Sequence, residues 1–71
     1  MTEYALVLEG ADDGGWWAYA PDLPGVVSAG DTPEEAESRF HEALAFHREA
    51  LKLRGEELPP PRSRSAMVQV V

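Results

Sequence analysis

Residues 14–32 read GGWWAYAPDLPGVVSAGDT, and the stretch PEEAESRFHEAL follows directly. Two short apolar runs flank a rigid turn, Pro21-Asp22-Leu23-Pro24-Gly25. Each proline fixes φ and removes a backbone donor, so this turn cannot continue a β-ladder. The order predicts a hairpin strand that passes through a fixed corner into a third strand, and then into a helix.

Two further strands are predicted outside this stretch. Residues 3–9 (EYALVLE) alternate in polarity, which places Tyr4, Leu6 and Leu8 on one face. The glycine-rich residues 11–15 suit a hairpin connection to the next strand. Residues 65–71 (SAMVQVV) form a fourth strand that should return parallel to the first, as helical crossovers usually do. The predicted strands span about residues 3–9, 16–20, 26–29 and 65–71.

The helix is predicted over about residues 33–54. Thr32 is a good N-cap, Pro33 suits the first helical position, and Glu35 completes a capping box. Gly55 is a plausible stop in the left-handed conformation. The stripe that should face the sheet consists of Ala36, Phe40, Ala43, Leu44, His47, Ala50 and Leu51.

These elements predict one α+β domain over residues 1–71. Its architecture is a β-β-β-α-β two-layer sandwich, a partial ribonuclease H-like fold, with sheet order 3-2-1-4 and one long helix on one face. That helix, at about 33 Å, is longer than strands of about 20 Å. Phe46 and Leu53 lie off its core stripe, and the first and fourth strands are apolar on both faces. We therefore expect a homodimer or a tetramer.

The charge is unevenly distributed. The net charge is −7, and residues 1–38 contain nine acidic residues but no Lys or Arg. Such a surface attracts basic partners and repels phosphate backbones, so direct nucleic-acid binding is not expected. The chain has no cysteine, no apolar run long enough for a membrane span and no basic N-terminal region. We expect a cytoplasmic protein without membrane contact.

The sequence predicts no enzyme, and no catalytic, metal or cofactor site. A ribonuclease H-like metal site needs carboxylates that converge from strand centres and helix. Glu3 and Glu9 instead lie at strand ends, and residues 65–71 contain no acid. His41 and His47 are too far apart around the helix to share a metal; we expect His47 in the core and His41 in solvent. No nucleophile elbow or phosphate-binding loop is present.

Four short motifs occur in a fixed order: Gly15-Trp16-Trp17, Pro21-Asp22-Leu23-Pro24-Gly25, Gly30-Asp31-Thr32 and Glu34-Glu35-Ala36. From about Tyr4 to Pro61 the chain resembles the HicB-like family of bacterial antitoxins. The resemblance implies a type II toxin–antitoxin system, in which this domain binds a small basic HicA-type mRNA-cleaving ribonuclease and masks its catalytic histidine. The alternative is a stand-alone homo-oligomeric HicB-like domain with an unknown ligand and no cognate toxin.

Many members of that family continue into a helix-turn-helix or ribbon-helix-helix domain, which this sequence lacks; DNA regulation is therefore not expected from this chain itself. Aromatic and acidic residues supply the candidate interface, since Trp and Tyr are enriched at interface anchors. The candidate partner-binding residues are Asp12, Asp13, Trp16, Asp22, Phe46 and Leu53. The residues expected to maintain the fold are Gly15, Pro21, Pro24, Gly25, Thr32 and Glu35.

Overall fold

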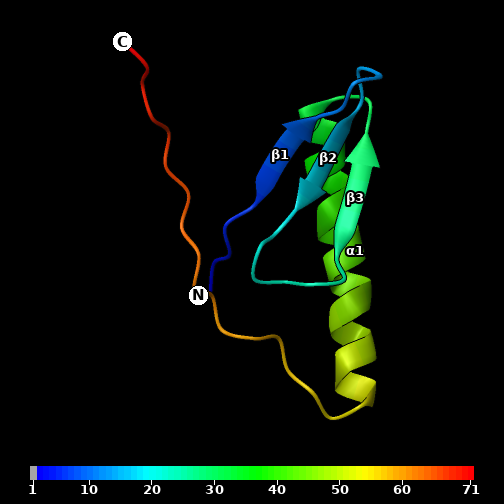
Figure 1. The fold of residues 1–71 in the computed structure, drawn as a ribbon. Helices are drawn as coiled ribbons and strands as arrows, with labels where there is room; N and C mark the ends of the chain where they lie inside the picture. Colours follow the sequence, from blue (N-terminus) through cyan, green and yellow to red (C-terminus); the bar gives the residue numbers. More distant parts are fainter. Residues whose placement is uncertain (1) are drawn as a thin grey trace.

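The computed structural model describes residues 2–71 and shows an α+β fold. Three antiparallel strands form one sheet in the order β1-β2-β3, and one long helix covers a single face of it (Figure 1). This arrangement confirms the predicted class and the 3-2-1 part of the sheet order. The elements are β1 (Val7–Gly10), β2 (Trp16–Tyr19), β3 (Val27–Gly30) and α1 (Pro33–Leu53).

The β1–β2 hairpin is closed by backbone and side-chain bonds within residues 11–15. The Ala11 amide donates to the Gly15 carbonyl at 2.8 Å, and the Gly14 amide donates to the Ala11 carbonyl at 3.1 Å. Gly14 has a φ of 89°, which a residue with a Cβ rarely adopts. Asp13 Oδ1 accepts from the Gly15 amide at 2.9 Å. The loop therefore fixes the register, in which Gly10 lies opposite Trp16 and Val7 opposite Tyr19.

The corner between β2 and β3 delivers a leucine to the core. The Leu23 amide donates to the Ala20 carbonyl at 3.0 Å, and the Val26 amide donates to the Leu23 carbonyl at 3.4 Å. Gly25 takes a φ of 89° and lets the chain turn into β3. As a result Leu23 is almost completely buried, although it lies in a loop.

Both helix ends carry the predicted caps. Thr32 Oγ1 accepts from the Glu35 amide at 3.1 Å. Glu35 reaches back to the Asp31 amide at 3.0 Å, one residue before the N-cap that a standard capping box would use. At the other end the Gly55 amide donates to Lys52 and the Glu56 amide to Leu51, the two bonds of a Schellman motif.

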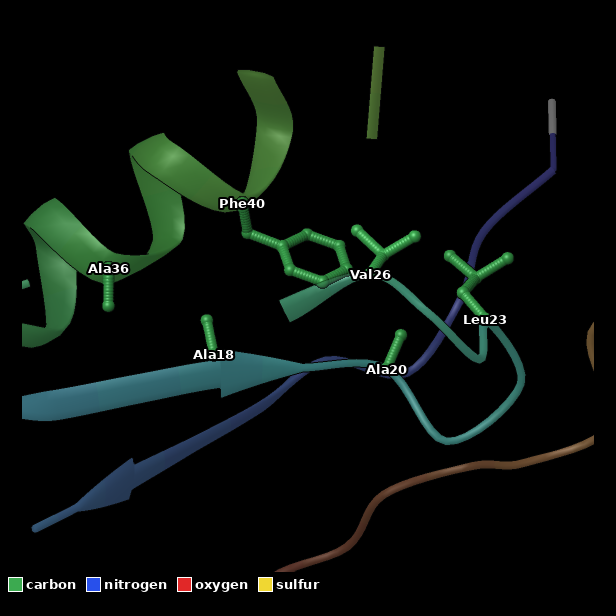
Figure 2. Close-up of a cluster of buried hydrophobic side chains, with 6 residues drawn as sticks. All are labelled: Ala18, Ala20, Leu23, Val26, Ala36 and Phe40. Carbon is green, nitrogen blue, oxygen red and sulfur yellow. The ribbon is translucent and has the colours of Figure 1, made fainter. Parts of the chain in front are cut away.

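The core lies between α1 and the inner face of β2. Figure 2 shows Ala36 and Phe40 of the helix pointing toward the sheet, where Ala18 and Ala20 face them. His41 is exposed, as predicted, and His47 is half-buried. Ala50, which the stripe placed in the core, is exposed, whereas its neighbour Leu51 is buried as predicted. The buried cluster comprises Ala18, Ala20, Leu23, Val26, Ala36 and Phe40.

The first turns of α1 approach the end of β3 very closely. A Cβ added at Gly30 would lie 2.7 Å from the Ala36 nitrogen and 2.9 Å from Glu35 Cβ. The Ser28 hydroxyl donates to the Ala36 carbonyl at 2.6 Å, and Arg39 Nη1 donates to the Ala29 carbonyl at 3.0 Å. These contacts attach the N-terminal half of the helix to β3.

The structure differs from the prediction at the two ends of the chain. The first strand begins at Val7 rather than Glu3, because β2 ends at its partner Tyr19 and Pro21 has no amide hydrogen to donate. Residues 65–71 are extended but pair with no strand of the described chain. The fourth strand and the full order 3-2-1-4 are therefore not confirmed.

We predict that Gly30→Ala lowers the free energy of unfolding by about 1–3 kcal/mol, the usual cost of overpacking. The added methyl would meet backbone atoms of α1 that cannot rotate away. Gly10→Ala is the matched control, because its Cβ would meet just the Trp16 ring at 3.9 Å. Urea denaturation followed by circular dichroism measures both; equal stability of the two variants would show that α1 is not held against β3.

We predict that Phe40→Ala costs about 3–5 kcal/mol, because Phe40 is the largest side chain that α1 contributes to the buried cluster. Leu44→Ala should cost less, since Leu44 is half-buried. Phe46→Ala, at an exposed position on the same helix, should change stability by about 0.5 kcal/mol or less in the monomer. Comparable losses at Phe40 and Phe46 in denaturation experiments would contradict this assignment of the helix face.

Candidate protein-binding surfaces

Acidic residues gather at one end of the molecule. The β1–β2 turn and the start of α1 both lie at the end of the sheet where β1 and β3 finish (Figure 1). Asp12 and Asp13 are exposed on that turn, and Asp31 and Glu34 are exposed beside the helix N-terminus. We call these four residues the acidic end. The positive end of the helix dipole offsets part of the repulsion between Asp31 and Glu34.

The face of the sheet turned away from α1 is uncovered. The register places Val7, Tyr19 and Val27 in one row, and Glu9, Trp17 and Ala29 in the next. The Tyr19 hydroxyl donates to Glu9 Oε2 at 3.1 Å, and this carboxylate raises the pKa of the Tyr19 phenol. Trp17 is 48% exposed and Val27 is 56% exposed. This open face, defined by those six residues, offers apolar surface with one acidic side chain.

The two tryptophans have different roles. Trp16 lies on the helix side and packs against the buried cluster, whereas Trp17 lies on the open face. Trp16 is the partner-binding residue predicted from the sequence, whereas the more exposed tryptophan is Trp17. The small residues Ala18 and Ala20 supplied a usable signal, because a helix packs closely on small side chains and Trp17 alternates with them.

Asp22 holds the segment that follows the helix. Its carboxylate accepts from the Arg62 and Ser63 amides, both at 2.7 Å, and from the Ser63 hydroxyl at 3.0 Å. These bonds lower the pKa of Asp22, the Arg62 amide contributing most. The Tyr4 hydroxyl also donates to the Pro59 carbonyl. We call residues 56–63 the connector; Asp22, a partner-binding candidate from the sequence, makes its described contacts within the chain.

The far half of α1 presents apolar residues to solvent and borders a hollow. Phe46 and Leu53 are 80% and 89% exposed, which agrees with their position off the core stripe. On another side of the helix an open hollow of about 970 Å³ lies between α1, Tyr4 and the connector. Basic residues line it as well, namely Arg48 and Lys52. Glu56 and Glu57 line the same hollow, so the charges at this end of the helix are mixed.

No group of three or more potential metal ligands comes together within residues 2–71. Over the same residues, no helix combines the length and the apolar character needed to cross a membrane.

Comparison with known proteins identifies the family. The model of the HicB-like antitoxins of bacterial toxin–antitoxin systems matches residues 4–70. The chain belongs to the HicB-like antitoxin family. Membership favours a binding role over catalysis. No solved structure shows significant similarity to it.

Three proteins from two organisms are similar to this chain in sequence. A UPF0150 protein of Synechocystis is 40% identical over 43 residues, which are 61% of this chain and 60% of that protein. A second Synechocystis UPF0150 protein is 39% identical over 59 residues, 83% of this chain and 75% of the relative. An uncharacterized 14.9 kDa protein of Haemophilus phage HP1 is 43% identical over 56 residues, 79% of this chain and 41% of the phage protein. The chain thus matches less than two thirds of the first and third of these.

The HicB-like motifs coincide with the fold-determining contacts described above. Gly15 closes the hairpin, Gly25 completes the corner, and Thr32 and Glu35 cap α1. Gly30 and Ala36 form the close approach between β3 and the helix. Asp22 is the exception, because its side chain bonds the connector about 40 residues later in the chain.

We predict that Asp22→Asn releases the connector, because an amide group is uncharged and offers a single acceptor oxygen. The amides of Arg62 and Ser63 should lose their protection from hydrogen exchange, whereas those of β2 keep it. Asp12→Asn is the matched control, since it changes the same charge at an exposed turn residue.

The same bonds predict a pH dependence. The pKa of Asp22 is below its ordinary value of 3.8 in the folded chain, so its contribution to stability is complete above pH 3.8 and is lost as the pH falls further. The Arg62 and Ser63 amide shifts should follow this loss in NMR titrations of the wild-type chain. If the Arg62 and Ser63 amide shifts changed with pH in the same way in Asp22→Asn, Asp22 would not be the group that titrates.

Proposed function

We propose that this chain is an antitoxin that binds and masks a small basic ribonuclease toxin of the HicA type. The observation that carries the proposal is membership of the HicB-like antitoxin family over residues 4–70. The acidic end supports it, because a basic ribonuclease would be attracted to such a surface. We further propose that the domain acts in the cytoplasm as a homodimer or tetramer, without direct contact to nucleic acid.

We place the toxin on the acidic end and the adjoining part of the open face. Asp12 and Asp13 project from the hairpin, and Trp17 lies on the row of the open face next to it. A half-exposed tryptophan beside charged residues is a common arrangement at interfaces, with the aromatic ring as anchor and the charges at the rim. In this proposal the aromatic anchor is Trp17 rather than the predicted Trp16, because the Trp16 side chain packs against the core.

Phe46, Leu53 and Asp22 have other roles in this proposal. Phe46 and Leu53 lie on the outer side of the helix and are assigned to a secondary contact, separate from the toxin interface. Asp22 is assigned to the connector, because all its described bonds go to residues 62 and 63. The toxin interface therefore rests on Asp12, Asp13 and Trp17.

The proposal is tested by expressing the chain together with the gene beside its own. An antitoxin should relieve the growth arrest that the neighbouring gene causes, and the two products should elute as one complex. Trp17→Ala should weaken that complex mainly through faster dissociation. If growth arrest persists and no complex elutes at any salt concentration, the antitoxin role is wrong, and the stand-alone domain with an unknown ligand takes its place.

We predict that Asp12→Asn/Asp13→Asn slows association with the toxin several-fold at low salt and leaves the dissociation rate nearly unchanged. Charges at an interface rim act mainly on the encounter rate. The difference from wild type should shrink between 0.1 and 1 M salt, as the Debye length falls from about 10 Å to about 3 Å. Surface plasmon resonance measures both rates.

The matched control is Glu56→Gln/Glu57→Gln, which removes two negative charges at the other end of α1. This variant should associate at close to the wild-type rate. An equal slowing in both double variants would show that net charge, and not the acidic end, steers the encounter.

A further inference from the structure

The segment formed by residues 65–71 is strand-like in sequence but exposed along its whole length. Residues 65–71 alternate so that Ala66, Val68 and Val70 share one face. Met67, Val68, Val70 and Val71 are all at least 86% exposed. Figure 1 shows this segment leaving the region near the N-terminus and diverging from β1. The radius of gyration is accordingly 13.6 Å, against about 11 Å for a compact chain of this length.

The sheet has a vacant position that matches this segment. β1 is an edge strand, and residues 2–6 before it pair with no strand of the described chain. Unpaired backbone groups on an edge are a template for another strand. The vacancy is as long as the segment: residues 64–71, extended at about 3.3 Å per residue, span about 26 Å, enough to run beside residues 3–10.

A hollow lies under the same edge. Residues 2–6 and α1 enclose a space of about 260 Å³, which adjoins the larger hollow of about 970 Å³ and shares Tyr4 and Leu44 with it. A single water occupies roughly 30 Å³ in the liquid, so these spaces are far larger than packing defects. Their apolar lining includes Leu6, Leu44 and Leu51. A strand beside residues 3–9 would place one row of side chains over this lining.

The chain's own segment does not enter this position. Asp22 fixes Arg62 and Ser63, and Tyr4 binds the Pro59 carbonyl, so the segment starts from a fixed point. From there it diverges from its own sheet (Figure 1). A second copy carries the same projecting segment and the same vacant edge. In a two-fold symmetric dimer, the segment of each copy can therefore occupy the vacant sheet edge of the other copy.

We propose that two copies of this chain exchange residues 65–71, each segment completing the sheet of the other beside residues 3–9. Ala66, Val68 and Val70 then cover the hollow beneath α1, and the backbone of residues 3–6 gains its missing hydrogen bonds. The fourth position of the sheet order 3-2-1-4 is supplied by the partner copy. This inference does not depend on the identity of any toxin.

The experiment uses the absence of cysteine from the chain. A Val71→Cys variant carries a nitroxide label and is mixed, at natural isotopic abundance, with ¹⁵N-labelled wild-type chain. Only contacts between copies can then broaden the ¹⁵N signals, and the reduced label gives the reference. We expect broadening within residues 3–10 and a sedimentation mass of two copies.

Two double variants separate the faces of the segment. Val68→Asp/Val70→Asp should give a monomer with an intact core, because both side chains are at least 86% exposed in the single chain. Ser65→Asp/Gln69→Asp adds the same charges on the opposite face and should remain dimeric.

Three results would overturn the exchange. One is a monomer at hundreds of micromolar. Another is broadening of residues 3–10 only when label and ¹⁵N are on the same chain, because the segment then pairs with its own sheet. The third is a dimer that survives Val68→Asp/Val70→Asp but is lost in Phe46→Glu/Leu53→Glu, because copies then associate through the outer side of α1.

Discussion

The close approach of α1 to β3 is the constraint on which the rest of the structure depends. Gly30 provides the room, and Ala18 and Ala36 are so small that helix and sheet meet almost backbone to backbone. Because the helix is held at its N-terminal half, its remaining turns project past the short strands. The open hollow beside Leu44 follows from this one-sided attachment, and Phe46 and Leu53 are exposed on the outer side of the projecting turns. The attachment of α1 at its N-terminal half thus determines which surfaces of the helix are open to partners.

The sequence predicted best those features whose chemistry is local. The Thr32 and Glu35 cap, the Gly55 stop and the corner built by two prolines each depend on residues a few positions apart, and the structure confirms them. Helix bounds were correspondingly accurate, within one residue. Period-two alternation also showed that Trp16 and Trp17 lie on opposite faces. Alternation alone does not show which face the helix covers, so it does not identify Trp17 as the exposed tryptophan.

Features that depend on distant partners were not predictable in the same way. The bonding of Asp22 to residues 62 and 63 joins two loops that no local rule connects. The extent of β1 depends on where β2 ends, and a strand at residues 65–71 needs a neighbour that the single chain does not supply. The outcome at both termini reflects the same physical fact: a strand exists through its hydrogen-bonded neighbour, whereas a helix satisfies its own backbone.

The position of the buried cluster along the chain has a consequence for the order of folding. Every member lies between residues 18 and 40, so the core closes over short loops at small entropic cost. Topologies of this kind fold quickly, and domains begin to fold as the ribosome releases them. The core can close without residues 65–71, because none of them belongs to the buried cluster. Residues 65–71 thus remain available for pairing with another chain after the core has folded.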